Sequence, residues 1–336
     1  MTDKGWQSSA DRDALLERAL MLKNIRAFFD ARGVIEVETP LLSHHRTTDP
    51  HLDSLSSRFR DQDCYLNTSP EYAMKRLLAQ LQQPIYQVCK AFRDDELGQY
   101  HNPEFSMLEW YRPGFDMFAL MDELSELVSA VISSKLGSMM PVDGAGLDIV
   151  PQRYTYLQAF ERFVGINPHT VTAEECFQLA REKNIEIPQG LTSADKRDDW
   201  LDWLLTQAIL PAFNKTGFTY LYDYPASQCS LAKVIEDQQA WPVAKRFELY
   251  FGETELANGF HELTDADEQL RRFEQENTVR RQQGKAVAQI DKHLIDALRS
   301  GLPECSGVAL GLDRLLMVKL SSKSIHEVLA FTWDRA

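Results

Sequence analysis

The sequence of 336 residues lacks the cysteine pattern of a disulfide-stabilised or zinc-binding protein. Its five cysteines are scattered along the chain, and none stands in CxxC spacing. They are typical of reduced thiols in the cytosol. The N-terminus has neither the basic patch nor the apolar run of a signal peptide, and no stretch approaches the length of a membrane span. We therefore expect a cytoplasmic protein that does not contact a membrane.

Glycine-rich phosphate loops are also missing. Neither GxxxxGKS/T nor GxGxxG occurs, so a bound nucleotide would need aromatic and arginine contacts instead of a glycine loop. A GxSxG elbow and a recognisable Cys/His pair are absent as well, so covalent catalysis by the protein is not indicated. The formal net charge of −14 at pH 7 argues against broad electrostatic binding to nucleic acid.

Apolar periodicity divides the chain into helices and short strands. Helices are expected at about 13–32, 71–81, 117–135, 195–213 and 291–300, with others after Thr264 and Gly311. Strands are expected at about 34–37, 64–67, 85–88, 104–111, 219–224, 247–250 and 255–257, and in the segment from Cys305 to the glycine turn at Gly311. Ser69 and Thr264 are the expected N-caps of their helices, and Thr172 with Glu175 fits a capping box. Residues 43–63 and 137–151 are expected to be loops.

The stretch from Phe92 to Tyr111 predicts two strands joined by a polar loop. Alternation in the second strand places Glu109 on one face with Phe105, Met107 and Tyr111. A carboxylate among bulky groups needs a cationic partner, and the stretch is suited to holding a flat ring beside a cation. On the hairpin alone, a Glu109 that pairs with a local Lys or Arg is equally compatible.

A second acidic group, Glu248, Glu255 and Glu262, falls within fifteen residues near the expected hairpin FGET. Close carboxylates repel each other unless a cation shares the site, and Mg²⁺ bridging phosphates is one solution. Charged edge strands in solvent are the simpler alternative. A bulge at Asn258-Gly259 is expected to return Glu255 and Glu262 to one side of the strand.

Three segments resemble the motifs of class II aminoacyl-tRNA synthetases. RGVIEVETPLL (Arg32–Leu42) resembles motif 1, FRDDE with HNPEFSMLEWY resembles motif 2, and GVALGLDRLLM (Gly307–Met317) resembles motif 3. TSPEYAMKRL, HNPEF, ELANGFHEL and LGLDR are similar to the lysyl subgroup. The resemblance implies an α+β fold, the class II catalytic fold with an antiparallel sheet flanked by helices. It would form one domain over 1–336, with a mainly helical insertion at 115–215.

The resemblance also implies ATP and Mg²⁺ as cofactors and assigns roles to individual residues. Arg93 would contact the α-phosphate and Arg314 the γ-phosphate, as the catalytic pair. The remaining ATP contacts would come from Asp94, Asp95, Asn102, Phe105, Glu255, Leu256 and Gly311. Mg²⁺ would be held by Glu248 and Glu255. The amino acid and its amines would be held by Ser69, Pro70, Glu71, Glu109, Tyr111, Asn258, Glu262 and Ala309.

The chain departs from lysyl-tRNA synthetases in ways that bear on function. Those enzymes carry an N-terminal OB-fold that reads the anticodon, whereas motif 1 begins here at residue 32, so we expect a free-standing core without anticodon recognition. The chain resembles the lysyl-synthetase paralogues that modify elongation factor P, in which (R)-β-lysine is activated with ATP and transferred to a lysine ε-amine. Asp94-Asp95 replaces the usual Asn-Glu, Tyr100 stands where Arg is frequent, and Ala309 replaces a usual Gly. The resemblance further implies a homodimer through Arg32–Leu42.

Three other functions remain open from the sequence. The first is a truncated enzyme that charges tRNA with lysine, and the second is a non-catalytic regulatory paralogue. The third is an amidating synthetase related to the aspartyl branch, which the lysyl-type Glu71 and Glu262 disfavour. Incubation with ATP, lysine or β-lysine, and either acceptor would separate them.

Overall fold

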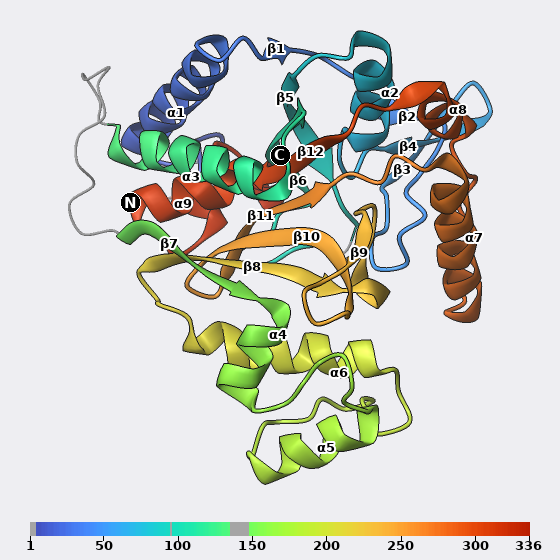
Figure 1. The fold of residues 1–336 in the computed structure, drawn as a ribbon. Helices are drawn as coiled ribbons and strands as arrows, with labels where there is room; N and C mark the ends of the chain where they lie inside the picture. Colours follow the sequence, from blue (N-terminus) through green and yellow to red (C-terminus); the bar gives the residue numbers. More distant parts are fainter. Residues whose placement is uncertain (1–4, 95, 135–147) are drawn as a thin grey trace. The chain divides into compact units, whose positions relative to one another are not determined.

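The computed structural model describes residues 5–94, 96–134 and 148–336. The chain separates into two units, Met1–Gly144 with Glu262–Ala336 (unit 1) and Ala145–His261 (unit 2). Both combine helices with mainly antiparallel strands (Figure 1), so the expected α+β class is confirmed. The single catalytic domain with a helical insertion at 115–215 stays a prediction.

The sheet of unit 1 is built around the predicted hairpin. Its strands run in the order β1 (Ile35–Glu36), β5 (Ile85–Phe92), β6 (Glu104–Pro113) and β12 (Cys305–Gly311). The β5–β6 and β6–β12 pairs are antiparallel, as expected, whereas the short edge strand β1 runs parallel to β5. This register brings the strands of the motif 2 and motif 3 segments side by side.

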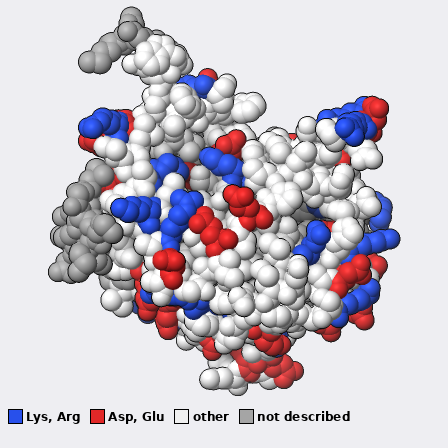
Figure 2. All heavy atoms as spheres, turned by 90° about the horizontal axis from the view of Figure 1, so that it is seen from above, with Lys and Arg blue, Asp and Glu red and all other residues white. Residues whose placement is uncertain are grey.

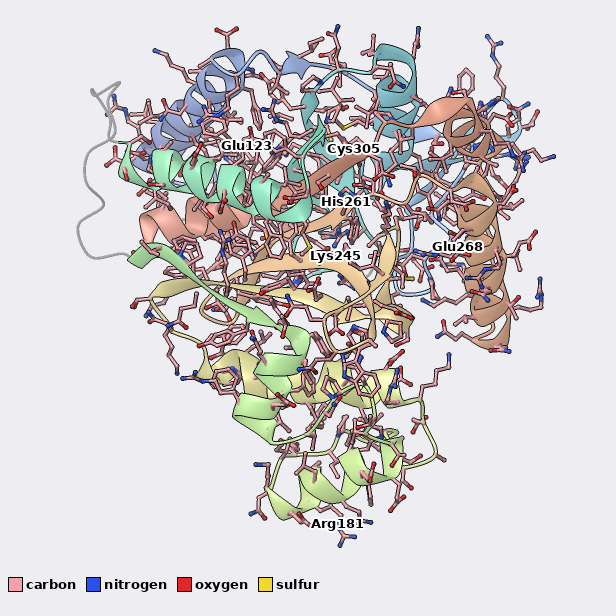
Figure 3. All side chains as sticks on the ribbon, viewed as in Figure 1. Glu123, Arg181, Lys245, His261, Glu268 and Cys305 are labelled. Atoms are coloured by element: carbon pink, nitrogen blue, oxygen red, sulfur yellow. The ribbon has the colours of Figure 1, made fainter. Side chains whose placement is uncertain are left out.

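Three helices cover one face of this sheet: α1 (Arg12–Asp30), α3 (Met117–Ser133) and α9 (Leu312–Leu320) (Figure 1). Trp110 on β6 packs edge-on against Phe29 of α1, and its indole N–H donates to Glu123 of α3. Glu123 is labelled on α3 in Figure 3. The backbone N–H of Ser106 donates to Asp313 at the start of α9. The predicted alternation of β6 is therefore confirmed, with Ser106 and Trp110 on the helix-covered face.

A second helical group of unit 1 consists of α2 (Glu71–Leu81), α7 (Ala266–Gln282) and α8 (Lys292–Gly301). The expected caps are wrong at two of them. Pro70, not Ser69, occupies the N-cap position of α2 and makes no side-chain bond. Asp265, not Thr264, caps α7, because its carboxylate accepts from two backbone N–H groups of the first turn.

Part of the segment expected to be a loop at 43–63 forms a small sheet instead. Its strands pair in the order β2 (Leu42–Ser43), β4 (Gln62–Leu66) and β3 (Ser56–Phe59). All four residues of β3 are exposed, so the strand has no apolar alternation for sequence reasoning to detect. Arg60 and Asp61 adopt positive φ in the turn that joins β3 to β4.

Unit 2 contains β7 (Asp148–Thr155), β8 (Gly217–Pro225), β9 (Val234–Glu236), β10 (Pro242–Phe251) and β11 (Thr254–His261). The β7–β8 pair is parallel, and the other pairs are antiparallel. Because β7 begins at residue 148, the expected loop at 137–151 is wrong at its end. The rest of that expected loop, residues 137–147, lies outside the described residues.

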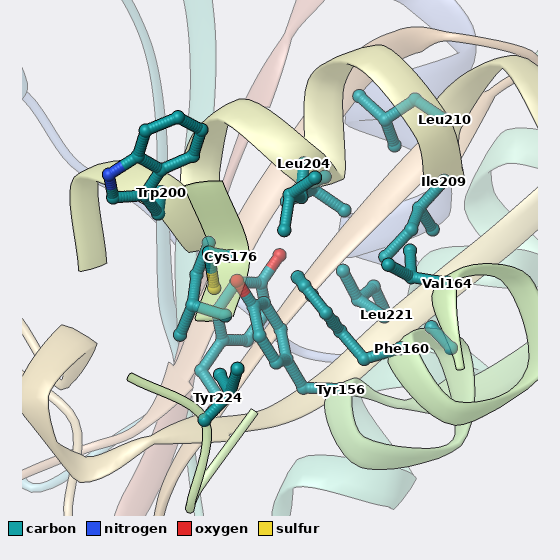
Figure 4. Packing of buried hydrophobic residues seen from close by; sticks show 14 of the residues in the cluster. Tyr156, Phe160, Val164, Cys176, Trp200, Leu204, Ile209, Leu210, Leu221 and Tyr224 are labelled. Carbon is teal, nitrogen blue, oxygen red and sulfur yellow. The ribbon is translucent and has the colours of Figure 1, made fainter. Parts of the chain in front are cut away.

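Helices of unit 2 pack an apolar cluster against β8 and β10 (Figure 4). They are α4 (Tyr156–Ala159), α5 (Ala173–Glu182) and α6 (Arg197–Leu204), with irregular turns between and after them. Thr172 and Glu175 form the predicted capping box of α5, each side chain bonding to the other residue's N–H. Tyr156, Trp200 and Leu204 are fully buried in the cluster.

All five cysteines are free thiols, which confirms that the protein has no disulfide framework. Among the helices of the described residues, none has the length and apolar character needed to cross a membrane.

Candidate active site

Strand β6 presents two polar side chains on the face opposite Trp110. Glu109 is 3% exposed and Tyr111 is 2% exposed. The Tyr111 hydroxyl donates to Glu109 Oε1 over 2.6 Å. Across the sheet, Ala309 pairs with Glu109 and Gly307 pairs with Tyr111, so these four residues share one face. Three predicted substrate residues, Glu109, Tyr111 and Ala309, therefore lie together.

Lys75 on α2 joins two further predicted residues. Its Nζ lies 2.7 Å from Glu71 Oε1 and 2.6 Å from Glu262 Oε2. Glu71 and Lys75 meet because residues four apart lie on the same side of a helix. The charges of all three act on Glu109 as well. We call Glu71, Lys75, Glu109, Tyr111 and Glu262 the unit 1 cluster.

The carboxyl groups of the unit 1 cluster are held in an environment that disfavours their charge. Burial raises the pKa of Glu262 to about 7, although the Lys75 ammonium opposes the shift. Burial, and then repulsion by Glu71, raises the pKa of Glu109 well above its usual value. Burial opposes the charge of Lys75 too, yet Glu262 and Glu71 together raise its pKa. The cluster therefore holds one firm cation among three carboxyls that need more positive charge to ionise.

Glu262 keeps unused hydrogen-bonding capacity. Its Oε2 forms an ion pair with Lys75, but the geometry leaves this buried oxygen without a hydrogen bond among the described residues. Buried acceptors are normally satisfied. This oxygen is therefore suited to accept from one more N–H donor.

Gly307 is the point of closest approach in the cluster. A methyl group added there would lie 2.4 Å from the Tyr111 ring and 2.7 Å from Glu262 Oε1. Glycine at this position therefore lets the Tyr111 ring and the Glu262 carboxylate lie against the backbone of β12.

Arg93 follows directly after β5 and lies beside Phe105 on β6. The guanidinium carbon is 5.1 Å from the centroid of the Phe105 ring, and Nη1 is 3.3 Å from Glu96 Oε1. The Arg93 Nε is buried and makes no hydrogen bond among the described residues. An unused guanidinium donor beside a half-buried ring fits a phosphate and an aromatic base, which are the two ends of ATP.

Arg314 lies in the first turns of α9, where its Nη2 is 2.6 Å from His101 Nε2. Burial lowers the pKa of His101, and the neighbouring Arg314 lowers it further. A neutral His101 ring can accept from the guanidinium and fix its direction. Arg314 is thus held by the same loop that carries the predicted ATP contacts.

Other predicted residues of unit 1 have different surroundings. The Asn102 amide donates to the Glu104 carbonyl and accepts from the Trp333 N–H, so both ends are held within the protein. Asp94 is exposed, and Asp95 lies outside the described residues. Ser69 and Pro70 directly precede α2, and Gly311 occupies the N-cap position of α9. The ATP and substrate roles of all these residues stay predictions.

Unit 2 holds the predicted metal ligand Glu248 among hydrogen-bond donors. Its Oε1 accepts from Arg246 and, over 3.3 Å, from Asn258. Its Oε2 accepts from the Tyr224 hydroxyl over 2.7 Å and from the Tyr250 hydroxyl. We call these five residues the Glu248 cluster. Glu248 is buried, and both of its oxygens are filled by donors of unit 2.

The expected bulge is present at a different place. Leu249 pairs with Ala257 but Tyr250 pairs with Glu255, so the irregularity falls at Leu256 instead of Asn258-Gly259. The extra residue turns Glu255 to the face that carries Tyr250 and Glu248, because directly paired residues share a face.

The residues fit Mg²⁺ only in part. Glu255 is half-buried on the correct face, but Glu248 as found has no oxygen left for an ion. Within the described ranges, no three His, Cys, Asp or Glu side chains converge as metal ligands.

Comparison with known proteins agrees with the motifs. The family described as tRNA synthetases class II (D, K and N) matches residues 6–335. The chain belongs to this family. It is 44% identical to the elongation factor P–(R)-β-lysine ligase of Salmonella arizonae, over 98% of both chains. It is 46% identical to the protein of the same name from Pseudoalteromonas translucida, again over 98% of both chains.

Membership of the class II family confirms the fold expected from the three motifs. Two residues of the site were not anticipated, namely Lys75 and Gly307. Lys75 lies four residues after Glu71, a spacing that predicts an ion pair on a helix. Gly307 lies inside an expected strand, where glycine commonly marks a close approach. Both signals were in the sequence, although neither shows that Glu262 is the shared neighbour.

Proposed function

We propose that the chain is an ATP-dependent ligase that activates (R)-β-lysine and transfers it to a lysine ε-amine of elongation factor P. The relatives carry that activity in their names. For this chain, the proposal is supported by the composition of the unit 1 cluster. Its three carboxyls face a single internal ammonium, so the site is short of positive charge. An amino acid with two ammonium groups supplies it.

In the first step, a carboxylate oxygen of the amino acid attacks the α-phosphorus of ATP. The new bond gives an acyl-adenylate, and the bond to pyrophosphate breaks. Arg93 would stabilise the charge that develops on the α-phosphate, since a fixed donor there acts most strongly in the transition state. Phe105 would stack on adenine and Arg314 would contact the γ-phosphate, with its direction set by His101.

In the second step, the neutral ε-amine of the acceptor lysine attacks the carbonyl carbon of the adenylate. An amide bond forms, AMP leaves, and the phosphate oxygen of the adenylate is the proton acceptor that the proposal names. No side chain of this chain is assigned as a base.

Mg²⁺, when bound, supplies charge neutralisation for the phosphates. Glu255 is the residue that would hold it, together with phosphate oxygens and water. Glu248 is assigned the role of orienting the strand pair through Asn258, because its oxygens are already filled.

The position of the substrate amine is proposed to depend on Ala309. Its side chain shares the face of Glu109 and of the Tyr111 hydroxyl. One methyl group in a site wall changes discrimination by about 1–3 kcal/mol. The methyl of Ala309 is therefore placed to favour a shifted amine over that of α-lysine.

The proposed homodimer uses the segment Arg32–Leu42. Ile35 is 40% exposed and Leu42 is 45% exposed, which leaves apolar surface on this segment.

The proposed acceptor is a protein and not tRNA. The net charge of −14 is unfavourable for binding the tRNA phosphates. The face drawn in Figure 2 carries Lys and Arg mixed with Asp and Glu. We also propose a cytoplasmic location.

The test is to incubate the protein with ATP, (R)-β-lysine or lysine, and either elongation factor P or tRNA. Mass spectrometry of the acceptors should show the added β-lysyl group on elongation factor P alone. Arg93→Ala tests the first step and should lower pyrophosphate exchange by at least about a hundredfold. Charging of tRNA, or no modification of either acceptor, would refute the proposal.

A further inference from the structure

Lys75 is a buried cation of unit 1 to which no role in binding or catalysis has yet been assigned. The side chain is 2% exposed, while the two carboxylates that it bridges are 15% and 1% exposed. Burying an ammonium group costs free energy unless its partners neutralise the charge. For packing alone, an apolar side chain of similar volume serves as well, because replacing a buried ion pair by apolar residues is often neutral for stability. The position of Lys75 between Glu71 and Glu262 therefore calls for a function.

Several titratable groups surround this ammonium. Tyr111 and Glu109 act from β6, and Cys305 lies at the start of β12 (Figure 3), where burial and the Glu262 charge raise its pKa. Glu276 on α7 is half-buried, and its charge interacts with that of Glu71. Apart from Lys75, none of these groups is cationic. The ammonium thus supplies the internal positive charge of the cluster.

We propose that Lys75 is a positioning and specificity-determining residue, which fixes Glu71 and Glu262 in place and sets the number of substrate amines that the site accepts. This inference rests on the proposed function. When all three carboxyls of the cluster are ionised, the one internal ammonium leaves two negative charges without a cationic partner in the cluster. Two ammonium groups of the amino acid balance them, whereas a substrate with one amine leaves a buried carboxylate uncompensated.

The bridge also fixes geometry. Glu71 belongs to α2, while Glu262 follows β11, and the backbone N–H of Glu262 donates to the Cys305 carbonyl. Nζ ties these separate elements through contacts of 2.7 and 2.6 Å. Without the ammonium, the two carboxylates repel each other, and one of them either moves or takes up a proton. Either change removes an acceptor for a substrate amine.

The first test uses Lys75→Met, which keeps an unbranched side chain, one heavy atom shorter, and removes the charge. The KM for (R)-β-lysine in pyrophosphate exchange should rise by at least about tenfold, while the KM for ATP changes by less than about threefold. Arg76→Met is the matched control, because it removes the same charge from an exposed position one residue away. It should leave both constants as in the wild-type protein. An unchanged KM for (R)-β-lysine in Lys75→Met would overturn the inference.

The second test separates charge from packing and does not depend on the folding of Lys75→Met. Lys75→Ala is assayed with added propylammonium or with 1-propanol, which has a similar shape and no charge. Propylammonium should lower the KM for (R)-β-lysine by at least about threefold, and 1-propanol should not. Equal effects of the two additives, or no effect of propylammonium, would contradict a role for the charge. Failure of the proposed function is distinguished by the wild-type protein itself. If it activates no diamino acid, the proposed function is wrong, whereas the tests of Lys75 concern only the inference.

Discussion

Two buried carboxylate clusters, one in each unit, are built from similar parts and differ in how completely they are satisfied. In the Glu248 cluster, one carboxylate accepts from an arginine, two tyrosine hydroxyls and an amide. In the unit 1 cluster, three carboxyls share one ammonium and one tyrosine hydroxyl. A satisfied cluster holds strands together, whereas an unsatisfied one has a place for a charged ligand. Burial alone therefore does not distinguish the two clusters, whereas the number of hydrogen-bond donors around each carboxylate does.

The most severe test of this difference is Glu262→Gln. It removes a charge that is already paired with Lys75 and is needed for a substrate amine, and breaking a buried pair costs about 3–5 kcal/mol. We expect kcat/KM for (R)-β-lysine to fall on the order of a hundredfold or more. Steady-state pyrophosphate exchange measures it. A loss below about threefold would mean that the unit 1 cluster is as structural as the Glu248 cluster.

The pH dependence of the KM for (R)-β-lysine should show whether the unit 1 cluster binds the amino acid. The pKa of Glu262 is raised to about 7, so below that pH its carboxyl is protonated and accepts an ammonium poorly. The KM for (R)-β-lysine should therefore rise as pH falls below 7, approaching about tenfold per pH unit. The KM for ATP serves as the internal control. A KM for the amino acid that stays flat from pH 8 to pH 5.5 would contradict this sign.

The same raised pKa has a consequence for folding stability. A carboxyl whose pKa is higher in the folded than in the unfolded protein binds more protons when folded. Its contribution is therefore present below its usual pKa of 4.5 and is lost as pH rises through about 7. Stability measured without substrate should decline over that interval, and substrate should offset the decline.

A smaller effect on substrate selectivity is expected from Ala309→Gly, next to the unit 1 cluster. Removing the methyl beside Glu109 should shift the ratio of kcat/KM for α-lysine against (R)-β-lysine toward α-lysine. The shift should be about tenfold, at the lower end of the range for one methyl group. Competition between the two amino acids in one reaction gives the ratio directly. An unchanged ratio would remove Ala309 from the account of specificity.

The smallest effect on activity is expected for Tyr224→Phe in the Glu248 cluster. It removes one donor from a buried carboxylate, which costs about 1–3 kcal/mol of unfolding free energy. The KM for (R)-β-lysine should change by less than about twofold. Urea unfolding and steady-state kinetics on the same preparation measure both quantities. A large rise in KM without loss of stability would show that this cluster also serves the amino acid.

The sequence predicts much of the fold for a physical reason. The strands and helices with strong apolar periodicity, such as β6 and α3, form where expected, because burial of one face determines them. The exposed strand β3 was missed, since it buries no apolar face. The bulge of β11 was expected from Asn258-Gly259 but falls at Leu256, because the register with β10 fixes its place.

The candidate site was also predicted only in part from the sequence. Motif resemblance gives Glu71, Glu109 and Glu262 as a group, but it gives no cation for them. The Lys75–Glu71 spacing is local and readable from the sequence. The contact between Lys75 and Glu262 joins residues far apart in the chain, and only the folded structure brings them together. At Glu248, four donors occupy the oxygens that the resemblance assigns to a metal, so the sequence did not reveal these contacts and the metal role stays a prediction.

The most direct test of the central claim is a calorimetric comparison of two ligands of the wild-type protein. One is (R)-β-lysine, and the other is the analogue of the same length that lacks the terminal amine. If the unit 1 cluster is short of two positive charges, the analogue should bind at least about a hundredfold more weakly, because it leaves a buried carboxylate unpaired. Equal affinity for the two ligands would contradict the account.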